Sequence, residues 1–296
     1  MKKIFFFSFL VFLFSGCLRL DDNLYVPQKI TSYQRDNYTG DQDFVLDASY
    51  KIPDSMIYEF TLNSQAPGES SSTEIYAEYI GRLARIATDT VIMYCHGNYW
   101  HMDFYWQRAK LLANTGWKNR YGVLMIDYRG YGLSKGKPSE DGLYADVDAA
   151  LAWLKLHGLS DKRLVIYGFS MGTAPATKLT AETRSMTPAK LILEAPFASA
   201  EVMVQDGSQL AMPGSFMTNL KIDNAEEIKS VQQPLLWMHG TKDAFLSITT
   251  QGEVVFKNYH GTRGVAVRVP EAGHSTIETT MGFKNYTDTL TSFITK

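Results

Sequence analysis

The stretch RLVIYGFSMGTAPATKLT, residues 163–180, decides the fold of this chain. Its first residues are apolar and rich in strand formers, and its last residues fit a helix. Between them lies GFSMG (168–172), in which Ser170 has a glycine two residues away on each side. A strand that turns so tightly into a helix strains the backbone of its serine, and the glycines remove side chains that would collide there. The stretch therefore predicts a reactive serine at a strand–helix turn.

The same alternation of strand and helix continues along the chain. Apolar runs recur at 90–95, 122–127, 163–167, 190–195, 234–239 and 265–269. Candidate helices lie near 100–115, 140–157, 171–184, in part of 200–230, and at 246–257 and 275–294. Apolar strands that alternate with helices indicate a parallel sheet buried on both faces, and the alternating stretches from Met56 to Ala84 predict an antiparallel pair before it. We expect one α/β domain over 53–296, with Ser170 at the carboxyl edge of the sheet, where such folds bind ligands.

A base and an acid follow two later strands. Asp243 lies in the loop after the run 234–239, and His274 comes directly after the run 265–269. We expect His274 to take the proton of Ser170 and Asp243 to orient the imidazole. Glu194 and Glu271 are the rival acids, although Glu194 more readily shapes the loop after its own strand.

Backbone N–H groups can complete such a site. An oxyanion hole needs two donors, one after the nucleophile and one in the loop after the first buried strand. Met171 supplies the first, and Asn98 of His96-Gly97-Asn98 is our choice for the second, with Tyr99 as its alternative. His96 is expected to shape this loop rather than to act as a base.

These motifs together resemble the α/β-hydrolase superfamily. The resemblance covers about 55–290 and rests on HGN, DYRGYGLSKGKPSE, GFSMG, LEAPF, MHGTKD and GHS, in that order. The order Ser170, Asp243, His274 is that of this fold. Within the superfamily the chain is similar to the compact branch with an HGN loop, which includes protein depalmitoylases and bacterial membrane-associated hydrolases. The resemblance implies helices on both faces of a mostly parallel sheet, a small or absent lid, and structural roles for Asp127 and Arg129.

The N-terminus carries its own signal. MKK precedes an apolar run of eleven residues, which is too short to span a bilayer, so residues 1–16 are interpreted as a secretory signal peptide. Its end resembles a bacterial lipobox, which implies lipidation at Cys17 and a membrane-anchored lipoprotein in the cell envelope; an ordinary cleaved signal is the alternative. Residues 17–52 are polar and rich in tyrosine, and we expect a tether followed by an irregular segment.

Composition excludes several other classes. The formal net charge is −2 over 296 residues, which leaves no basic field for nucleic acid. The six histidines and two cysteines show no zinc-binding spacing, so we expect neither a metal nor a cofactor. Cys95 lies within an apolar run and is not expected to pair with Cys17.

The segment 198–233 is where this superfamily inserts a lid, and its length excludes a large cap domain. Its methionines and Phe216 either face an acyl chain or pack on the core. The residues expected to bind substrate are Tyr99, Trp100, Met212 and Phe216. The favoured hypothesis is a serine hydrolase that cleaves esters or thioesters of acyl or lipid-like compounds. A serine peptidase or amidase, and a catalytically idle binding module with the same fold, are the alternatives.

Overall fold

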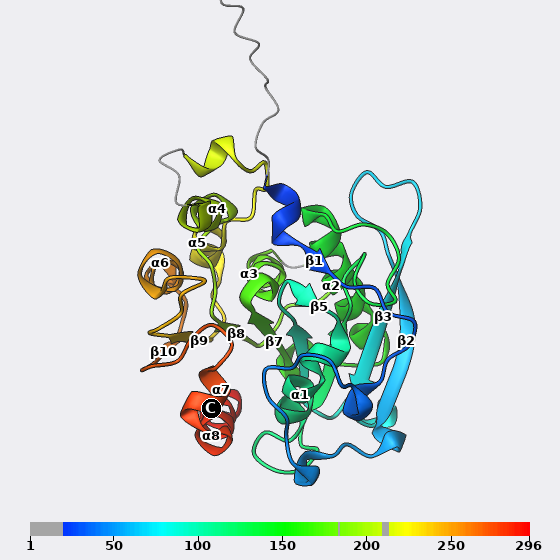
Figure 1. Cartoon of the computed structure of the whole chain (residues 1–296). Coiled ribbons are helices and arrows are strands. Elements are labelled where there is room, and N and C mark those ends of the chain that lie inside the picture. Colours follow the sequence, from blue (N-terminus) through cyan, green and yellow to red (C-terminus); the bar gives the residue numbers. More distant parts are fainter. Residues whose placement is uncertain (1–19, 183, 209–212) are drawn as a thin grey trace, which may run out of the picture.

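The computed structural model describes residues 20–182, 184–208 and 213–296. Its centre is an eight-stranded sheet with the order β10-β9-β8-β7-β4-β6-β3-β2 (Figure 1). The strands are β2 (Ile57–Ser64), β3 (Thr73–Ile80), β4 (Val91–Cys95), β6 (Gly122–Ile126), β7 (Leu164–Phe169), β8 (Lys190–Glu194), β9 (Leu235–Gly240) and β10 (Gly264–Val269). The strand that leads to Ser170, β7, lies in the middle of this sheet.

The direction of pairing follows the sequence pattern. From β6 to β10 every neighbouring pair is parallel, and the interior strands are fully buried. β2 and β3 pair with each other, and β3 with β6, in the antiparallel direction. The predicted fold class, a mostly parallel sheet preceded by antiparallel strands, is confirmed.

Helices cover both faces of the sheet. They are α1 (Met102–Ala113), α2 (Glu140–Leu156), α3 (Thr173–Ala181), α4 (Ala200–Ser208), α5 (Asn224–Glu227), α6 (Glu253–Asn258), α7 (Ile277–Met281) and α8 (Phe283–Thr295). Alternate residues of β7 pack into two separate cores: Leu164 and Ile166 join α2 and α3, and Val165 and Tyr167 join α1 and α8. Because successive strand side chains point to opposite faces, one apolar run serves both layers.

The six predicted strands of the parallel part agree with the observed ones within two residues, whereas the stretch predicted to end near Ala84 ends as β3 at Ile80, and the helices agree less closely. The helix predicted over 275–294 is two helices, which break at Gly282 with φ 77°. A left-handed residue of this kind favours glycine and ends regular helical geometry. In the region predicted to hold a small lid, the structure places α4 and, after the residues it does not describe, a 3-10 turn at Gly214–Phe216.

The N-terminal segment, residues 20–52, differs from the expected tether in its described part. It packs along the domain and buries Leu24, Phe44 and Ile52 (Figure 1). Its short strand β1 (Val26–Pro27) pairs with β5 (Tyr99–Trp100) in the loop after β4. These contacts are made by 3-10 turns and single side chains, which leave no periodic pattern in the sequence. The signal peptide 1–16 and Cys17 lie outside the described residues.

Candidate active site

Ser170 lies at the turn between β7 and α3. Its φ is 52°, a left-handed value that is uncommon for a residue with a side chain. A Cβ atom at Gly172 would overlap the carbonyl group of Cys95, and one at Gly168 would collide with the backbone of Gly172 and Thr173. The two glycines therefore allow the close contact between β7, α3 and β4 that places Ser170 at the strand end.

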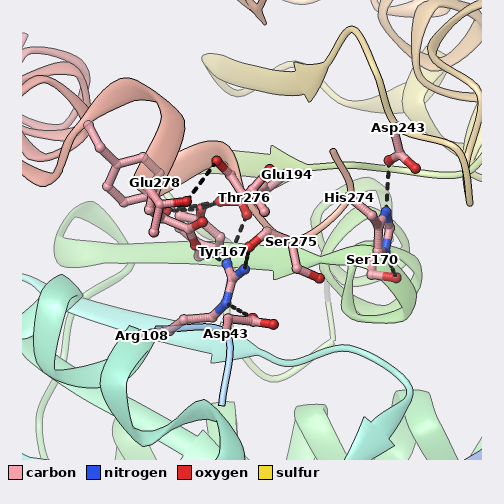
Figure 2. A network of polar contacts seen from close by, with 12 residues as sticks. Asp43, Arg108, Tyr167, Ser170, Glu194, Asp243, His274, Ser275, Thr276 and Glu278 are labelled. Carbon is pink, nitrogen blue, oxygen red and sulfur yellow. Dashed lines mark hydrogen bonds and ion pairs between the residues drawn. The ribbon is translucent and has the colours of Figure 1, made fainter. Parts of the chain in front are cut away.

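The structure brings together Ser170, His274 and Asp243. His274 Nε2 lies 2.9 Å from Ser170 Oγ, and His274 Nδ1 lies 2.7 Å from Asp243 Oδ2 (Figure 2). The three residues come from the ends of β7, β10 and β9, which all point to the same edge of the sheet. This is the hydrogen-bonded arrangement that a nucleophile, a base and an orienting acid require.

Asp243 is held as a carboxylate. Its Oδ1 accepts hydrogen bonds from the backbone N–H groups of Phe245 (2.9 Å) and Leu246 (2.7 Å). His239 Nε2 lies 3.3 Å from its Oδ2, as a residue that supports the acid loop. Burial opposes ionisation, but hydrogen bonds from His239, His274 and Leu246 outweigh it and hold the pKa of Asp243 well below its ordinary value.

The loop predicted to supply an oxyanion-hole donor, residues 96–100 and called the oxyanion loop below, follows β4, which pairs directly with β7. The loop carbonyl of Asn98 accepts hydrogen bonds from Val26 N–H (3.0 Å) and from the hydroxyl of Tyr131 (2.9 Å). Cys95 at the end of β4 pairs with Gly168, so the loop that carries the two candidate donors, Asn98 and Tyr99, starts beside the turn of Ser170 and Met171.

His96 is fully buried and takes no part in the contacts of Ser170. Its Nδ1 lies 2.7 Å from Gly97 O, and its ring stacks on Tyr105. Asp127 Oδ1 lies 3.5 Å from His96 Nε2 and also accepts the N–H of Met102 at 2.8 Å. Both residues therefore hold the oxyanion loop in shape.

Arg129 likewise contacts structural partners. It binds the buried carboxylate of Asp146 at 2.9 Å and the hydroxyl of Ser64 at 3.1 Å. These contacts join the loop after β6 to α2 and β2.

The rival acids lie elsewhere. Glu194 accepts hydrogen bonds from Arg108 (2.8 Å), from the hydroxyl of Tyr286 (2.9 Å) and from that of Tyr167. Glu271 is exposed on the loop before His274, where its backbone N–H binds Thr241. Neither carboxylate contacts His274 in the structure.

A buried ion network lies beside the site (Figure 2). Arg108 of α1 contacts the carboxylates of Asp43, Glu194 and Glu278, and its Nη2 lies 3.4 Å from the carbonyl of Ser275, the residue after His274. Burial raises the pKa of Glu278 well above its ordinary value, although Arg108 opposes this. One cation thus joins the N-terminal segment, β8 and α7 behind the histidine loop. Sequence analysis missed this role, because an arginine in an amphipathic helix gives no sign of burial.

An apolar groove of about 300 Å³ lies next to the site. It is lined by Asn98 and by the apolar side chains of Leu20, Leu24, Tyr99, Met203, Val204 and Phe245. The Phe245 ring also contacts the ring of His274 edge-on, with centroids 5.1 Å apart. The groove therefore borders both the oxyanion loop and the base.

Of the residues predicted to bind substrate, only some lie at the groove. Tyr99 lines the groove, whereas Trp100 is not part of its lining and stacks on Phe104. Phe216 is 66% exposed and does not line the groove either, and Met212 lies outside the described residues. Sequence analysis missed Leu20, Leu24 and Phe245, although Phe245 follows the acid by only two positions, which was a usable signal.

Two further observations concern the described part of the chain, residues 20–296 without 183 and 209–212. No helix there is long and apolar enough to cross a membrane. Nor does that part hold a cluster of three or more histidine, cysteine or acidic side chains arranged to bind a metal ion.

Comparisons with known proteins agree with this architecture. A family model described as "Serine aminopeptidase, S33" matches residues 87–233. Alpha/beta hydrolase domain-containing protein 17B of Xenopus tropicalis is 31% identical over 211 residues, which cover 69% of this chain and 66% of that protein. The corresponding values for alpha/beta hydrolase domain-containing protein aho-3 of Caenorhabditis elegans are 32% over 206 residues, 69% and 57%. The chain thus spans less than two thirds of the length of these relatives.

Solved structures support the fold. The Pyrococcus furiosus esterase Pf2001 superposes with a TM-score of 0.65 at 16% identity and covers 91% of this chain and 98% of its own. An esterase of Exiguobacterium antarcticum gives 0.58 at 19% identity, over 80% of this chain and all of its own. At such identities the likeness concerns the fold alone.

Proposed function

Because this chain belongs to the α/β-hydrolase superfamily, we propose that it is a serine hydrolase that cleaves carboxylic esters or thioesters of acyl or lipid-like compounds. The observation that carries the proposal is the hydrogen-bond chain from Ser170 Oγ through His274 to Asp243. Its three members stand at one sheet edge, next to an apolar groove.

The mechanism follows from the geometry. His274 Nε2 accepts the proton of Ser170 as its oxygen attacks the substrate carbonyl carbon, and Asp243 stabilises the imidazolium that forms. The N–H groups of Asn98 and Met171 stabilise the tetrahedral oxyanion, each by about 3 kcal/mol. His274 then protonates the leaving alcohol or thiol. Water, activated by the same imidazole, cleaves the acyl-enzyme and releases the acid.

The proposal is tested with Ser170→Ala. We expect this variant to lose labelling by a fluorophosphonate probe and to lose at least about 10⁴-fold in kcat on p-nitrophenyl butyrate, while its melting temperature stays near that of the wild type. Wild-type turnover by the variant would exclude Ser170 as the nucleophile. Absence of both labelling and turnover in the wild type would instead favour a binding module that keeps the hydrolase fold.

A serine peptidase or amidase is the second candidate, favoured by the description of the matched family model. An aminopeptidase must hold the ammonium group of its substrate with a buried carboxylate or equivalent acceptor. The groove lining in the described residues contains no carboxylate, and the carboxylate of Asp206 in the adjoining hollow is hydrogen-bonded to Thr250 and Gln251, which supports the acyl substrate. Comparison of p-nitrophenyl esters with aminoacyl p-nitroanilides separates the two: the ester proposal fails if only the anilides are cleaved.

We also propose that the protein is exported and anchored to a bacterial membrane by acyl groups on Cys17. The support is the sequence of residues 1–17, with its charged start, short apolar run and small residues before the cysteine. Two or three acyl chains anchor a protein stably, since each buried CH₂ contributes about 0.8 kcal/mol. Cys17→Ser should move the protein from the membrane fraction to the soluble one, and an unmodified Cys17 in the intact mass of the membrane-extracted wild type would exclude the anchor.

A further inference from the structure

The apolar groove is built in part by a segment outside the family match. Its wall combines Leu20 and Leu24 of the N-terminal segment with Met203 and Val204 of α4. Leu24 is almost fully buried, with 4% of its surface exposed. Removal of the N-terminal segment would therefore open one side of the groove to solvent.

The start of the N-terminal segment is hydrogen-bonded to residues 217–219, which follow α4 in the chain. Leu20 N–H donates to the carbonyl of Met217 at 2.8 Å. Asp21 Oδ1 accepts hydrogen bonds from the hydroxyl of Thr218 (2.6 Å) and from Asn219 N–H (2.7 Å). These bonds fix the position of Leu20, which forms part of the groove wall.

The same segment also holds the oxyanion loop. Val26 and Pro27 pair in parallel with Tyr99 and Trp100, and Val26 N–H binds the carbonyl of Asn98. The carbonyl of Asn98 belongs to the planar peptide group between Asn98 and Tyr99. Hydrogen bonds that hold this carbonyl therefore restrain the turn that presents the N–H of Asn98. The groove wall and the oxyanion loop are thus parts of one hydrogen-bonded unit.

A second hollow indicates which end of a substrate enters the groove. This hollow, of about 480 Å³, shares Met203, Gly207 and Phe245 with the apolar groove and extends beside the acid, along Asp206, Ala244, Ser247 and Thr250. His274 must protonate the leaving group, so the leaving group lies on the side of the acid loop. The apolar groove, which borders Asn98 and Tyr99, remains for the acyl chain.

We propose that Leu20 and Leu24 of the N-terminal segment, with Tyr99, Met203, Val204 and Phe245, form the acyl-chain site of this enzyme and set the chain length that it accepts. The inference rests on the proposed function, because an acyl chain enters the groove only as part of an ester or thioester held at Ser170. Each methylene that enters the groove should raise kcat/KM up to about fourfold, until the groove is full.

The test varies the acyl chain at a constant leaving group. Kinetics on p-nitrophenyl acetate, butyrate, hexanoate and octanoate give the ratio of kcat/KM for octanoate to that for acetate. Met203→Trp, which fills the groove, should lower this ratio at least tenfold. Leu24→Ala, which widens it, should move the preferred chain length upwards. The opposite directions distinguish an effect on the groove from a general loss of folding.

The matched control is Leu156→Trp on α2, where the side chain is 86% exposed and outside the site. It should leave the ratio at the wild-type value. The inference is overturned if neither groove variant changes the ratio, or if both change only the response to the alcohol chain in a series of alkyl acetates.

A binding measurement separates this inference from the proposed function. In a Ser170→Ala background, fluorescence titration with a fluorescent dodecanoyl ester should give a Kd that Met203→Trp weakens at least tenfold. If binding depends on Met203 but the wild type cleaves no ester, the groove assignment stands and the hydrolase proposal fails. If esters are cleaved and binding ignores Met203, the groove assignment fails alone.

Discussion

Asp243→Asn isolates the contribution of the acid because the side chain should keep its place. The amide oxygen can still accept the N–H groups of Phe245 and Leu246, which hold Oδ1 at 2.9 and 2.7 Å. The amide nitrogen would then face His274 Nδ1, where the carboxylate now lies at 2.7 Å. A donor at this point favours the tautomer with its proton on Nε2, which cannot accept a proton from Ser170. We expect kcat to fall about 10³- to 10⁴-fold, or about 4–5 kcal/mol of transition-state stabilisation.

The assay is steady-state hydrolysis of p-nitrophenyl butyrate, with Glu194→Gln as the matched control. Glu194 binds Arg108, Tyr167 and Tyr286 rather than the histidine, so this variant should lose stability and keep kcat within about tenfold. An Asp243→Asn enzyme with more than a tenth of wild-type kcat would refute the assignment. The reverse ranking of the two variants would move the acid to Glu194.

The pH dependence of stability provides a second measurement on Asp243→Asn. Hydrogen bonds hold the pKa of folded Asp243 below its ordinary value of 3.8, against the effect of burial. Ionised Asp243 therefore stabilises the folded state above about pH 3.8, and this stabilisation is lost as the pH falls toward the folded pKa. In thermal melts, the difference in melting temperature between the wild type and Asp243→Asn should be largest at pH 6 and smaller below pH 4. A constant difference across this range would contradict the depressed pKa.

Substitutions at three further residues test two buried charges and the support of the oxyanion loop. Burial raises the pKa of Glu78 to about 7, against the effect of Arg35, so the wild type loses stability as the pH rises from 4.5 to 7. In chemical denaturation, the free energy of unfolding of Glu78→Gln should therefore rise by about 3 kcal/mol relative to that of the wild type across that range. A pH-independent difference between the two would exclude the raised pKa. Arg108→Met leaves buried carboxylates without a counter-charge and should lower the free energy of unfolding by about 3–5 kcal/mol, and Arg108→Lys by less; equal losses would exclude a role for the charge. Tyr131→Phe removes one hydrogen bond to the Asn98 carbonyl, and a loss of about 1 kcal/mol should appear as about a fivefold lower kcat at unchanged KM. A change in KM alone would argue against positioning of the oxyanion loop.

The sheet and the serine turn could be predicted because their signals are local. The strand before Ser170 is a short apolar run, and the two glycines mark the one turn where β7, α3 and β4 come too close for a side chain. Asp243 and His274 each lie in the short loop after an apolar run. Parallel strands carry such residues to one edge, so their meeting follows from topology without knowledge of any side-chain contact.

The N-terminal segment could not be predicted in the same way. Its contacts are single residues, such as Asp43 on Arg108, which are separated by 65 positions in the chain. A polar residue that docks on a distant buried partner has the same local sequence as one in solvent. Leu24 is an example. The polar composition around it predicts a tether, but its side chain is nearly fully buried in the groove wall. The periodicity of apolar residues in a sequence does not indicate which distant segments pair with each other.

This difference changes what an anchor at Cys17 would do. A tether of about thirty residues would let the site move freely above a bilayer. The structure instead places Leu20, three residues after the cysteine, in the groove wall with a hydrogen bond to Met217, and three residues span at most about 10 Å. The proposed lipid would then hold the wall of the apolar groove against the headgroups. An acyl chain that leaves the bilayer could enter the groove over a short path, with its carbonyl directed to the oxyanion loop that the same N-terminal segment holds. Anchor, groove and oxyanion loop would act on one substrate because one stretch of chain connects them.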